Sequence, residues 1–139
     1  MTIKTGEDML AADVLATAGV VIIPLRLNTV DALTTSDVDM EWVPEKLVGW
    51  KITDVAGLCS DPSSSGDVTL TVKKNGVAIL TTQITISAGQ TTSRTAPVQP
   101  VIDVTKNTLA LGDRLSAECS GAGVGVTWCT VQAKAELVP

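Results

Sequence analysis

The chain has 139 residues and a formal net charge of −5, and 45% of its residues are hydrophobic against 18% charged, which fits one folded domain rather than a disordered tail. It contains no His, which excludes histidine-dependent catalytic triads and imidazole metal sites, and it also contains no Tyr or Phe. The acidic balance disfavours direct contact with nucleic acid, because phosphate binding depends on Lys and Arg.

The first residues, "MTIKTGEDML", lack the basic region and apolar core of a secretory signal. No run of about 18 apolar residues predicts a membrane span. We therefore expect synthesis in a cytosol and no membrane partner. Residues 1–18 are predicted to form an N-terminal arm or short helix, since "GEDMLAADVLAT" weakly matches an amphipathic helix. The functional interpretation is that the arm docks on a partner or neighbouring subunit. The alternative is an ordinary short helix packed on its own domain, or a frayed terminus.

The run "GVVIIPLRLN" at 19–28 predicts a strongly apolar strand interrupted by Pro24. Proline donates no hydrogen bond to a ladder, so this strand should lie at a sheet edge or carry a bulge. An edge beside an arm invites contact between subunits. The alternative is that "VVII" belongs to the core. The candidate partner-binding residues are Met9, Leu10, Val14, Val20, Val21, Ile22, Ile23 and Leu25.

The segment "SDVDMEWV" alternates apolar and acidic residues, the pattern of a strand with one wet acidic face. The acidic row could bind a cation or a basic partner, but a solvated face is the simpler interpretation. The next segment, "EKLVGWKITDVAGLC", predicts a second alternating strand. The apolar residues expected to share faces are Val38, Met40 and Trp42 in the first strand, and Val48, Trp50 and Ile52 in the second; the acids are Asp37, Asp39 and Glu41.

The stretch "TVKKNGVAIL" at 71–80 predicts a β-hairpin with a two-residue turn at Asn75-Gly76. Apolar residues alternate on both sides of that turn. We expect one face to carry Val68, Leu70 and Val72 from the segment before the turn and Ala78, Leu80, Ile84 and Ile86 from the segment after it.

The last third of the chain begins with a polar connection, where Pro97 and Pro100 argue against a central strand before Val101. A Gly112-Asp113 turn, a strand near 113–119, a Gly-rich turn at 121–125 and a long final strand follow. In the final strand we expect Cys129, Val131, Ala133, Ala135 and Leu137 on one face and Gln132, Lys134 and Glu136 on the other.

Roughly eight or nine short strands with turn signals every 8–12 residues predict an all-β fold, an antiparallel β-sandwich over residues 19–139 as a single domain. A jelly roll is the arrangement we expect. No second domain, linker or internal repeat is visible.

Few patterns in the sequence point to chemistry. The loop "DPSSSGD" at 61–67 resembles the start of a calcium-binding loop, but its twelfth position is Val72 where a bidentate Glu is needed, so a solvated turn is the better account. Carboxylate pairs could serve a glycosidase, yet nothing marks two acids as buried and convergent. We predict no catalytic residues, no metal, no cofactor and no enzyme activity.

The three cysteines, Cys59, Cys119 and Cys129, form no metal-binding spacing. Cys119 and Cys129 could lie on neighbouring strands. Three buried free thiols are the simplest expectation in a reducing compartment, and a disulfide or intermolecular bridge is the alternative.

The series "LVGWKITDVAG", "VTLTVKKNGVAILTTQITISAG", "TLALGDRLSAEC" and "GAGVGVTWCTVQAKAEL" resembles a β-sandwich module of tailed-bacteriophage virion proteins, found in capsid decoration proteins, head fibres and tail-fibre tips. The resemblance covers about residues 46–137 and depends on the order of the motifs. The matching residues are Gly49-Trp50, Lys74-Asn75-Gly76, Ile84 to Gly89, Gly112-Asp113 and the stretch from Gly121.

The resemblance implies a structural virion protein that binds the capsid exterior, with the major capsid protein as partner. Family members commonly form trimers, so it also implies a homo-trimer. The alternative is a tail-fibre or adhesin-type module that binds a receptor or glycan through loops 60–67 and 88–97. A hydrolase is the third hypothesis, and turnover of polysaccharide or peptidoglycan would support it.

Overall fold

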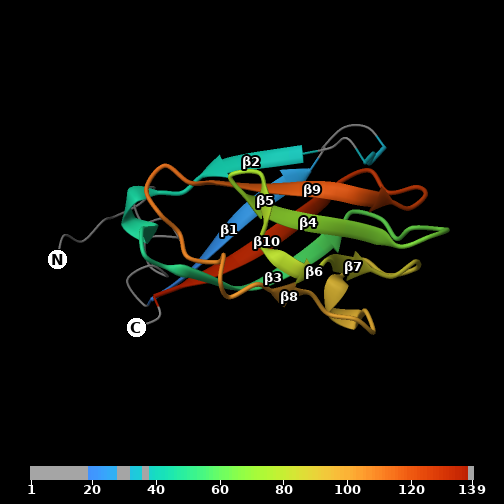
Figure 1. The fold of residues 1–139 in the computed structure, drawn as a ribbon. Coiled ribbons are helices and arrows are strands. Elements are labelled where there is room, and N and C mark those ends of the chain that lie inside the picture. Colours follow the sequence, from blue (N-terminus) through green and yellow to red (C-terminus); the bar gives the residue numbers. More distant parts are fainter. Residues whose placement is uncertain (1–18, 28–31, 36–37, 138–139) are drawn as a thin grey trace, which may run out of the picture.

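The computed structural model describes residues 19–27, 32–35 and 38–137, and this part of the chain is all-β without an α-helix (Figure 1). The predicted arm or helix at 1–18 lies outside the described residues. The strands are β1 (Val20–Leu27), β2 (Val38–Trp42), β3 (Lys51–Cys59), β4 (Val68–Lys74), β5 (Val77–Ala78), β6 (Leu80–Thr82), β7 (Ile84–Ile86), β8 (Val101–Ile102), β9 (Arg114–Ala122) and β10 (Cys129–Glu136), and the short 3-10 turns are η2 (Glu45–Leu47) and η3 (Ser93–Thr95).

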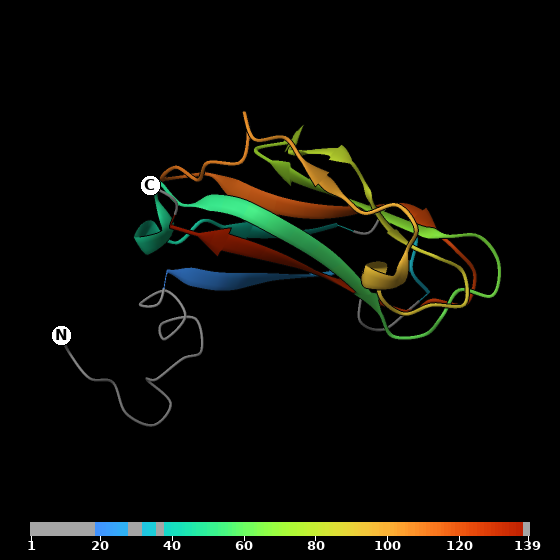
Figure 2. The same cartoon turned by 90° about the horizontal axis from the view of Figure 1, so that it is seen from below.

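All strand pairings are antiparallel, and they form a three-stranded sheet in the order β1-β10-β3 and a five-stranded sheet in the order β2-β9-β4-β5, with β7 also on β4. Strands β6 and β8 make a small third sheet. In Figure 2 β9 lies above β3, β10 and β1, so the two main sheets form separate layers. The antiparallel all-β prediction is confirmed and the arrangement is consistent with a β-sandwich, whereas the jelly-roll topology stays a prediction.

The core lies between the two main sheets and is built mainly from alternate residues of β1, β4 and β10, together with the buried residues of β3 and β9. Gly57 on β3 marks how closely the layers approach, because a Cβ atom there would lie 3.0–3.3 Å from the side chains of Ile84, Leu70 and Ile86. The alternation expected for β4 and β10 is confirmed, although Leu137 follows β10 and is exposed. The buried apolar residues of these two strands are Val68, Leu70, Val72, Cys129, Val131, Ala133 and Ala135.

The predicted hairpin turn is present, since Asn75 and Gly76 both have positive φ, at 53° and 82°. Its outgoing arm differs from the prediction. β5 ends after two residues, and the chain then crosses to pair with β8 before β7 returns to β4. Because this break shifts the alternation, Ile79 is buried and Ala78 is exposed, so the prediction for Ala78 was wrong.

Val48 also departs from its predicted place. Trp50 and Ile52 are buried as expected, but Val48 is exposed because it lies in the turn after η2, before β3 begins. Gly49 at the end of that turn has φ of 89°, which accounts for a glycine at this point of the sequence.

The edge position predicted for the strand with Pro24 is confirmed among the described residues, since β1 pairs with β10 alone. The amide of Arg26 donates to the Asp39 side chain at 2.7 Å and therefore points away from β10. Pro24, two residues earlier, points to the same outer edge, where its missing N–H does not interrupt the ladder.

Candidate interaction surface

The two faces of β2 are reversed relative to the expectation that its acidic residues form the wet face. Asp39 and Glu41 pair with Ala117 and Leu115, which are buried residues of β9. Directly opposite residues in an antiparallel pair share a face, so both acids lie on the inward face of the sheet. Asp37 lies outside the described residues.

Inward-facing acids are tolerated here because β2 is the edge strand of its sheet. Asp39 is half-buried and accepts hydrogen bonds from the amides of Arg26 at 2.7 Å and Met40 at 2.9 Å, while Glu41 stays exposed. The carboxylate of Asp39 therefore joins the edges of the two sheets. It also occupies the N–H of Arg26, which would otherwise be open to another strand.

The apolar residues of β2 consequently face outward, and we call Val38, Met40 and Trp42 the β2 outer row. Their exposed fractions are 49%, 48% and 67%. The guanidinium of Arg114 lies 5.7 Å from the centre of the Trp42 ring. Sequence reasoning missed this row as a candidate site, because alternation reveals two faces but does not say which one points outward.

A groove of about 280 Å³ adjoins the outer row and lies between β1 and the segment that runs from β2 into η2. Trp42 belongs to its lining, together with residues 21–24 of β1. The groove therefore brings the end of the outer row next to the free edge of the three-stranded sheet.

The candidate partner-binding residues of β1 divide between the two sides of the strand. Val21, Ile23 and Leu25 face the core and are buried. Ile22 is 37% exposed and Val20 is half-buried. Met9, Leu10 and Val14 lie outside the described residues. Among the members of this set that the structure describes, Val20 and Ile22 are the ones with side-chain surface open to a partner, and a binding role for the set stays a prediction.

Two of the motifs that carry the resemblance meet in one polar cluster. The Asn75 side-chain amide donates to Asp113 Oδ1 at 2.7 Å, and Asn75 Oδ1 accepts from the amide of Arg114 at 3.0 Å. The amide of Ala110 donates to Asp113 Oδ2 at 2.8 Å, and Lys74 Nζ lies 3.9 Å from the same oxygen. This cluster fixes the hairpin tip against the turn before β9, so these motif residues have a structural role.

The Asp113 carboxyl titrates below the usual range. Burial raises its pKa, but the hydrogen bonds from Asn75 and the Ala110 amide, with the charge of Lys74, lower the pKa by more. Asp113 is therefore held as a carboxylate in the folded protein.

The loop 60–67 is held by its own polar residues. Ser63 is buried, and its hydroxyl lies 2.7 Å from the Gly66 carbonyl oxygen and 2.9 Å from the amide of Val124, from which it accepts. A Cβ at Gly123 would lie 2.4 Å from this hydroxyl oxygen. Asp67 Oδ1 accepts from the amide of Ala88 at 3.0 Å. The Ser63 hydroxyl, one of the oxygens in the calcium-like pattern, thus serves in hydrogen bonds that hold the turn.

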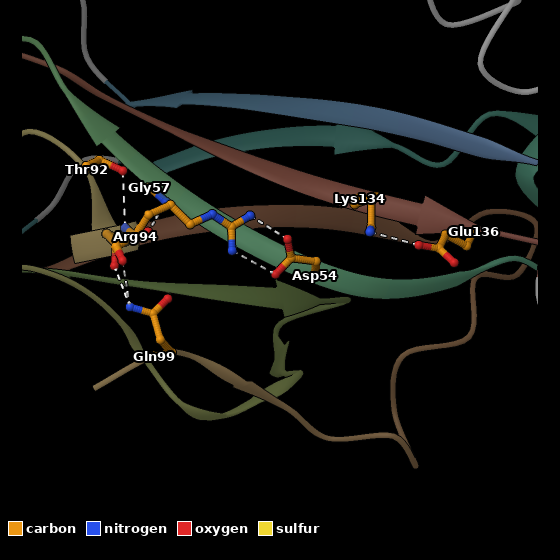
Figure 3. A network of polar contacts seen from close by, with 8 residues as sticks. Asp54, Gly57, Thr92, Arg94, Gln99, Lys134 and Glu136 are labelled. Carbon is orange, nitrogen blue, oxygen red and sulfur yellow. Dashed lines mark hydrogen bonds and ion pairs between the residues drawn. The ribbon is translucent and has the colours of Figure 1, made fainter. Parts of the chain in front are cut away.

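The loop 88–97 is anchored to the outer face of the three-stranded sheet (Figure 3). Arg94 in η3 makes two hydrogen bonds to the Asp54 carboxylate on β3, at 3.2 and 2.5 Å. The Ser93 hydroxyl accepts from the buried amide of Gly57 at 2.9 Å, and Lys134 pairs with Glu136 at 2.9 Å. The two loops considered for receptor binding are therefore tied down at their bases.

The charges in Figure 3 hold one another in the ionised form. The hydrogen bond from Arg94 is the main cause that lowers the pKa of Asp54, and the same bond raises the pKa of Arg94. Lys134 and Glu136 act on each other in the same way, so the pKa of the amine rises and that of the carboxyl falls. A general acid needs a carboxyl whose pKa is raised, and these carboxyls show the opposite shift.

A second hollow lies on the outer face of the three-stranded sheet, near the end of the sheet where β10 begins. It measures about 400 Å³, and its lining includes Trp128, Arg26 and Gln132. Trp128 is 38% exposed. An exposed indole beside a guanidinium and an amide offers both a stacking face and hydrogen-bond donors.

All three cysteines are buried and none is in a disulfide. Cys119 and Cys129 do not lie on neighbouring strands, since β9 and β10 belong to different sheets. The neighbour of Cys129 is Cys59, and their sulfur atoms are 3.0 Å apart.

Within the described ranges, no group of three or more Cys, Asp or Glu residues is placed to hold a metal ion. No helix in the same part of the chain is long and apolar enough to cross a membrane. Comparisons with protein-family models, curated proteins and solved structures found no match to this chain. The phage resemblance thus depends on the sequence motifs alone.

Proposed function

We propose that this protein is a structural virion protein that binds the outside of a tailed-phage capsid, as a decoration or head-fibre protein, with the major capsid protein as partner. The observation that carries the proposal is the β2 outer row. Val38, Met40 and Trp42 form one continuous line of exposed apolar side chains on an edge strand. Covering such a line with another protein gains free energy by removing apolar surface from water.

The surroundings of the outer row support a protein as the occupant. Trp, Met and Arg are enriched in protein interfaces, and Trp42, Met40 and Arg114 lie together here. Lys73 and Glu118 on the same face form an ion pair at 2.7 Å, which supplies a polar rim whose charges are already balanced. An apolar centre with a polar rim is the usual anatomy of a non-obligate interface.

The mechanism is mechanical rather than catalytic. A rigid sandwich that binds the assembled lattice but not free coat protein stabilises the lattice by mass action. If three copies associate, each weak contact gains from the effective concentration that the other two provide. The carboxyl groups with lowered pKa fit this proposal, because their partners use them to hold loops and turns.

The test is binding to capsids of the encoding virus that lack this protein, measured by co-sedimentation and negative-stain imaging. We expect evenly spaced protrusions with the wild-type protein. Trp42→Ser and Met40→Ser should weaken binding by about 10-fold or more each, the size of a hot-spot loss. Val104→Ser is the matched control, because Val104 is 78% exposed and follows β8 in another sheet.

Three results would count against the proposal. Wild-type protein that leaves capsids bare would refute capsid binding, and normal binding by the Trp42 and Met40 variants would remove the outer row as the contact. A free protein of 14.4 kDa at micromolar concentration would refute the homo-trimer. Circular dichroism of each variant checks that loss of binding is not loss of fold.

The second candidate function is a receptor- or glycan-binding module, which the hollow around Trp128 favours. Indole rings stack on sugar faces, and Arg26 and Gln132 could donate to hydroxyl groups. Binding to host-cell surface glycans that is abolished by Trp128→Ala and unaffected by Trp42→Ser would favour this function over capsid binding.

A further inference from the structure

Cys59 and Cys129 face each other across the central ladder of the three-stranded sheet. Cys59 ends β3, Cys129 begins β10, and the two are direct partners in the antiparallel register. Their sulfur atoms lie 3.0 Å apart. The two side chains therefore approach each other from adjacent strands, although 70 positions separate them in the chain.

The type of pairing favours a bond between the two sulfurs. The amide of Cys59 donates to the Thr91 carbonyl at 2.8 Å, so it points away from β10. The pair is thus of the non-hydrogen-bonded kind, in which Cα atoms are about 4.5 Å apart and side chains are closest. That spacing falls inside the Cα range of about 4.4–6.8 Å that disulfides require.

We propose that Cys59 and Cys129 form a cross-strand disulfide when the protein meets a small-molecule disulfide such as oxidised glutathione. In the first step the Cys59 thiolate attacks one glutathione sulfur, which forms a mixed disulfide and releases one glutathione thiolate. Cys129 then loses its proton to solvent and attacks the Cys59 sulfur, which expels the second glutathione thiolate. Overall, two protein thiols are oxidised to one disulfide and one glutathione disulfide is reduced to two thiols.

Cys59 is the thiol that reacts first. It is 8% exposed, whereas Cys129 is fully buried. The hydrogen bond between the two thiols also lowers the pKa of Cys59 and raises that of Cys129. Both residues lie at strand ends, next to the exposed residues Leu58 and Trp128, where local opening costs less than in mid-strand.

The bond would link the two ends of the region that contains β4 to β9. Closing a loop of about 70 residues removes much of the freedom of the unfolded chain, so oxidation should raise the melting temperature by about 10 °C. The sandwich would fold with thiols in a reducing cytoplasm and become cross-linked after it reaches an oxidising medium. This inference does not depend on capsid binding.

The experiment uses the full chain in two samples: one is folded with reduced thiols and then incubated in a glutathione redox buffer, and the other is unfolded and refolded in the same buffer so that burial does not block access. We expect the intact mass to fall by about 2 Da, one thiol to remain titratable, and peptide mapping to join Cys59 to Cys129. Cys119→Ser is the matched control and should keep the oxidation-dependent rise in melting temperature. Cys59→Ser and Cys129→Ser should lose that rise.

The wild-type protein alone decides the proposal if a variant does not fold. Three titratable thiols after oxidative refolding, or a disulfide that includes Cys119, would overturn it. A bond between Cys59 and Cys129 that leaves the melting temperature unchanged would overturn the stabilising role.

Discussion

Removing the Asp113 carboxylate tests whether the contact between the hairpin tip and the turn before β9 stabilises the sandwich. The Asp113→Ala variant loses acceptors for the Asn75 side chain at 2.7 Å and the Ala110 amide at 2.8 Å. Asp113 is only 8% exposed, so both hydrogen bonds are made to a carboxylate that is largely shielded from water. The change should therefore lower the free energy of unfolding.

The expected magnitude follows from these two bonds. Hydrogen bonds to a charged group contribute about 1.5–3 kcal/mol each, which sets an upper limit of about 3–6 kcal/mol. Asn75 is exposed at the hairpin tip and reaches solvent once released, so we expect a loss of about 2–3 kcal/mol. With a urea m-value of about 1.5–2 kcal/mol per molar, the midpoint should fall by about 1–2 M.

Urea unfolding followed by circular dichroism measures this loss. The control is Glu118→Ala, which breaks the Lys73–Glu118 ion pair of 2.7 Å between side chains that are about one-third exposed. That pair should contribute less than about 1 kcal/mol. Asn75→Ala added to Asp113→Ala should cost less than the sum of the single losses, because the two side chains share one bond.

The pH dependence supplies a second measurement. Because the pKa of Asp113 is lowered in the folded state, its contribution is present above the unfolded pKa of about 3.9 and is lost as the pH falls through the folded value. The difference in stability between wild type and Asp113→Asn should therefore shrink below about pH 4. An Asp113→Ala midpoint within about 0.3 M of wild type, at unchanged m, would refute the reasoning.

Two further predictions concern the three-stranded sheet. Gly57→Ala should lower the free energy of unfolding by about 1–3 kcal/mol, because the new Cβ would lie 3.0–3.3 Å from three core side chains. The control is Thr53→Ala at an exposed position of the same strand, which should change the free energy of unfolding by no more than about 0.5 kcal/mol. Equal effects of the two substitutions in calorimetry would contradict close packing at Gly57. A double-mutant cycle on Asp54 and Arg94, whose side chains are 36% and 54% exposed, should give a coupling energy of about 0.5–1 kcal/mol. This coupling energy should weaken in 1 M salt and vanish as the pH falls below about 4 and passes through the lowered pKa of Asp54. A coupling energy that changes with neither salt nor pH would show that charge does not hold η3.

Local chemistry was enough to predict several parts of this protein from its sequence. Asn75-Gly76 specifies its turn because both positions need positive φ, and Pro24 specifies an edge because it has no amide hydrogen. The alternation in β4 and β10 predicted their buried faces because each strand lies between neighbours and has one side on the core. In these cases the property belongs to the residue or to its near neighbours.

The tertiary structure decided which face of β2 points outward. The alternation of Val38, Met40 and Trp42 with acids allowed either orientation, and the register with β9 placed Asp39 and Glu41 inward, beside Ala117 and Leu115. Which residues are buried on an edge strand depends on the neighbouring sheet. Here the Asp39 side chain on β2 faces the backbone amide of Arg26 on β1 and not apolar side chains. The same dependence on distant strands paired Cys59 with Cys129 and left Ala78 exposed, because such contacts form between segments whose separation in the chain gives no local signal.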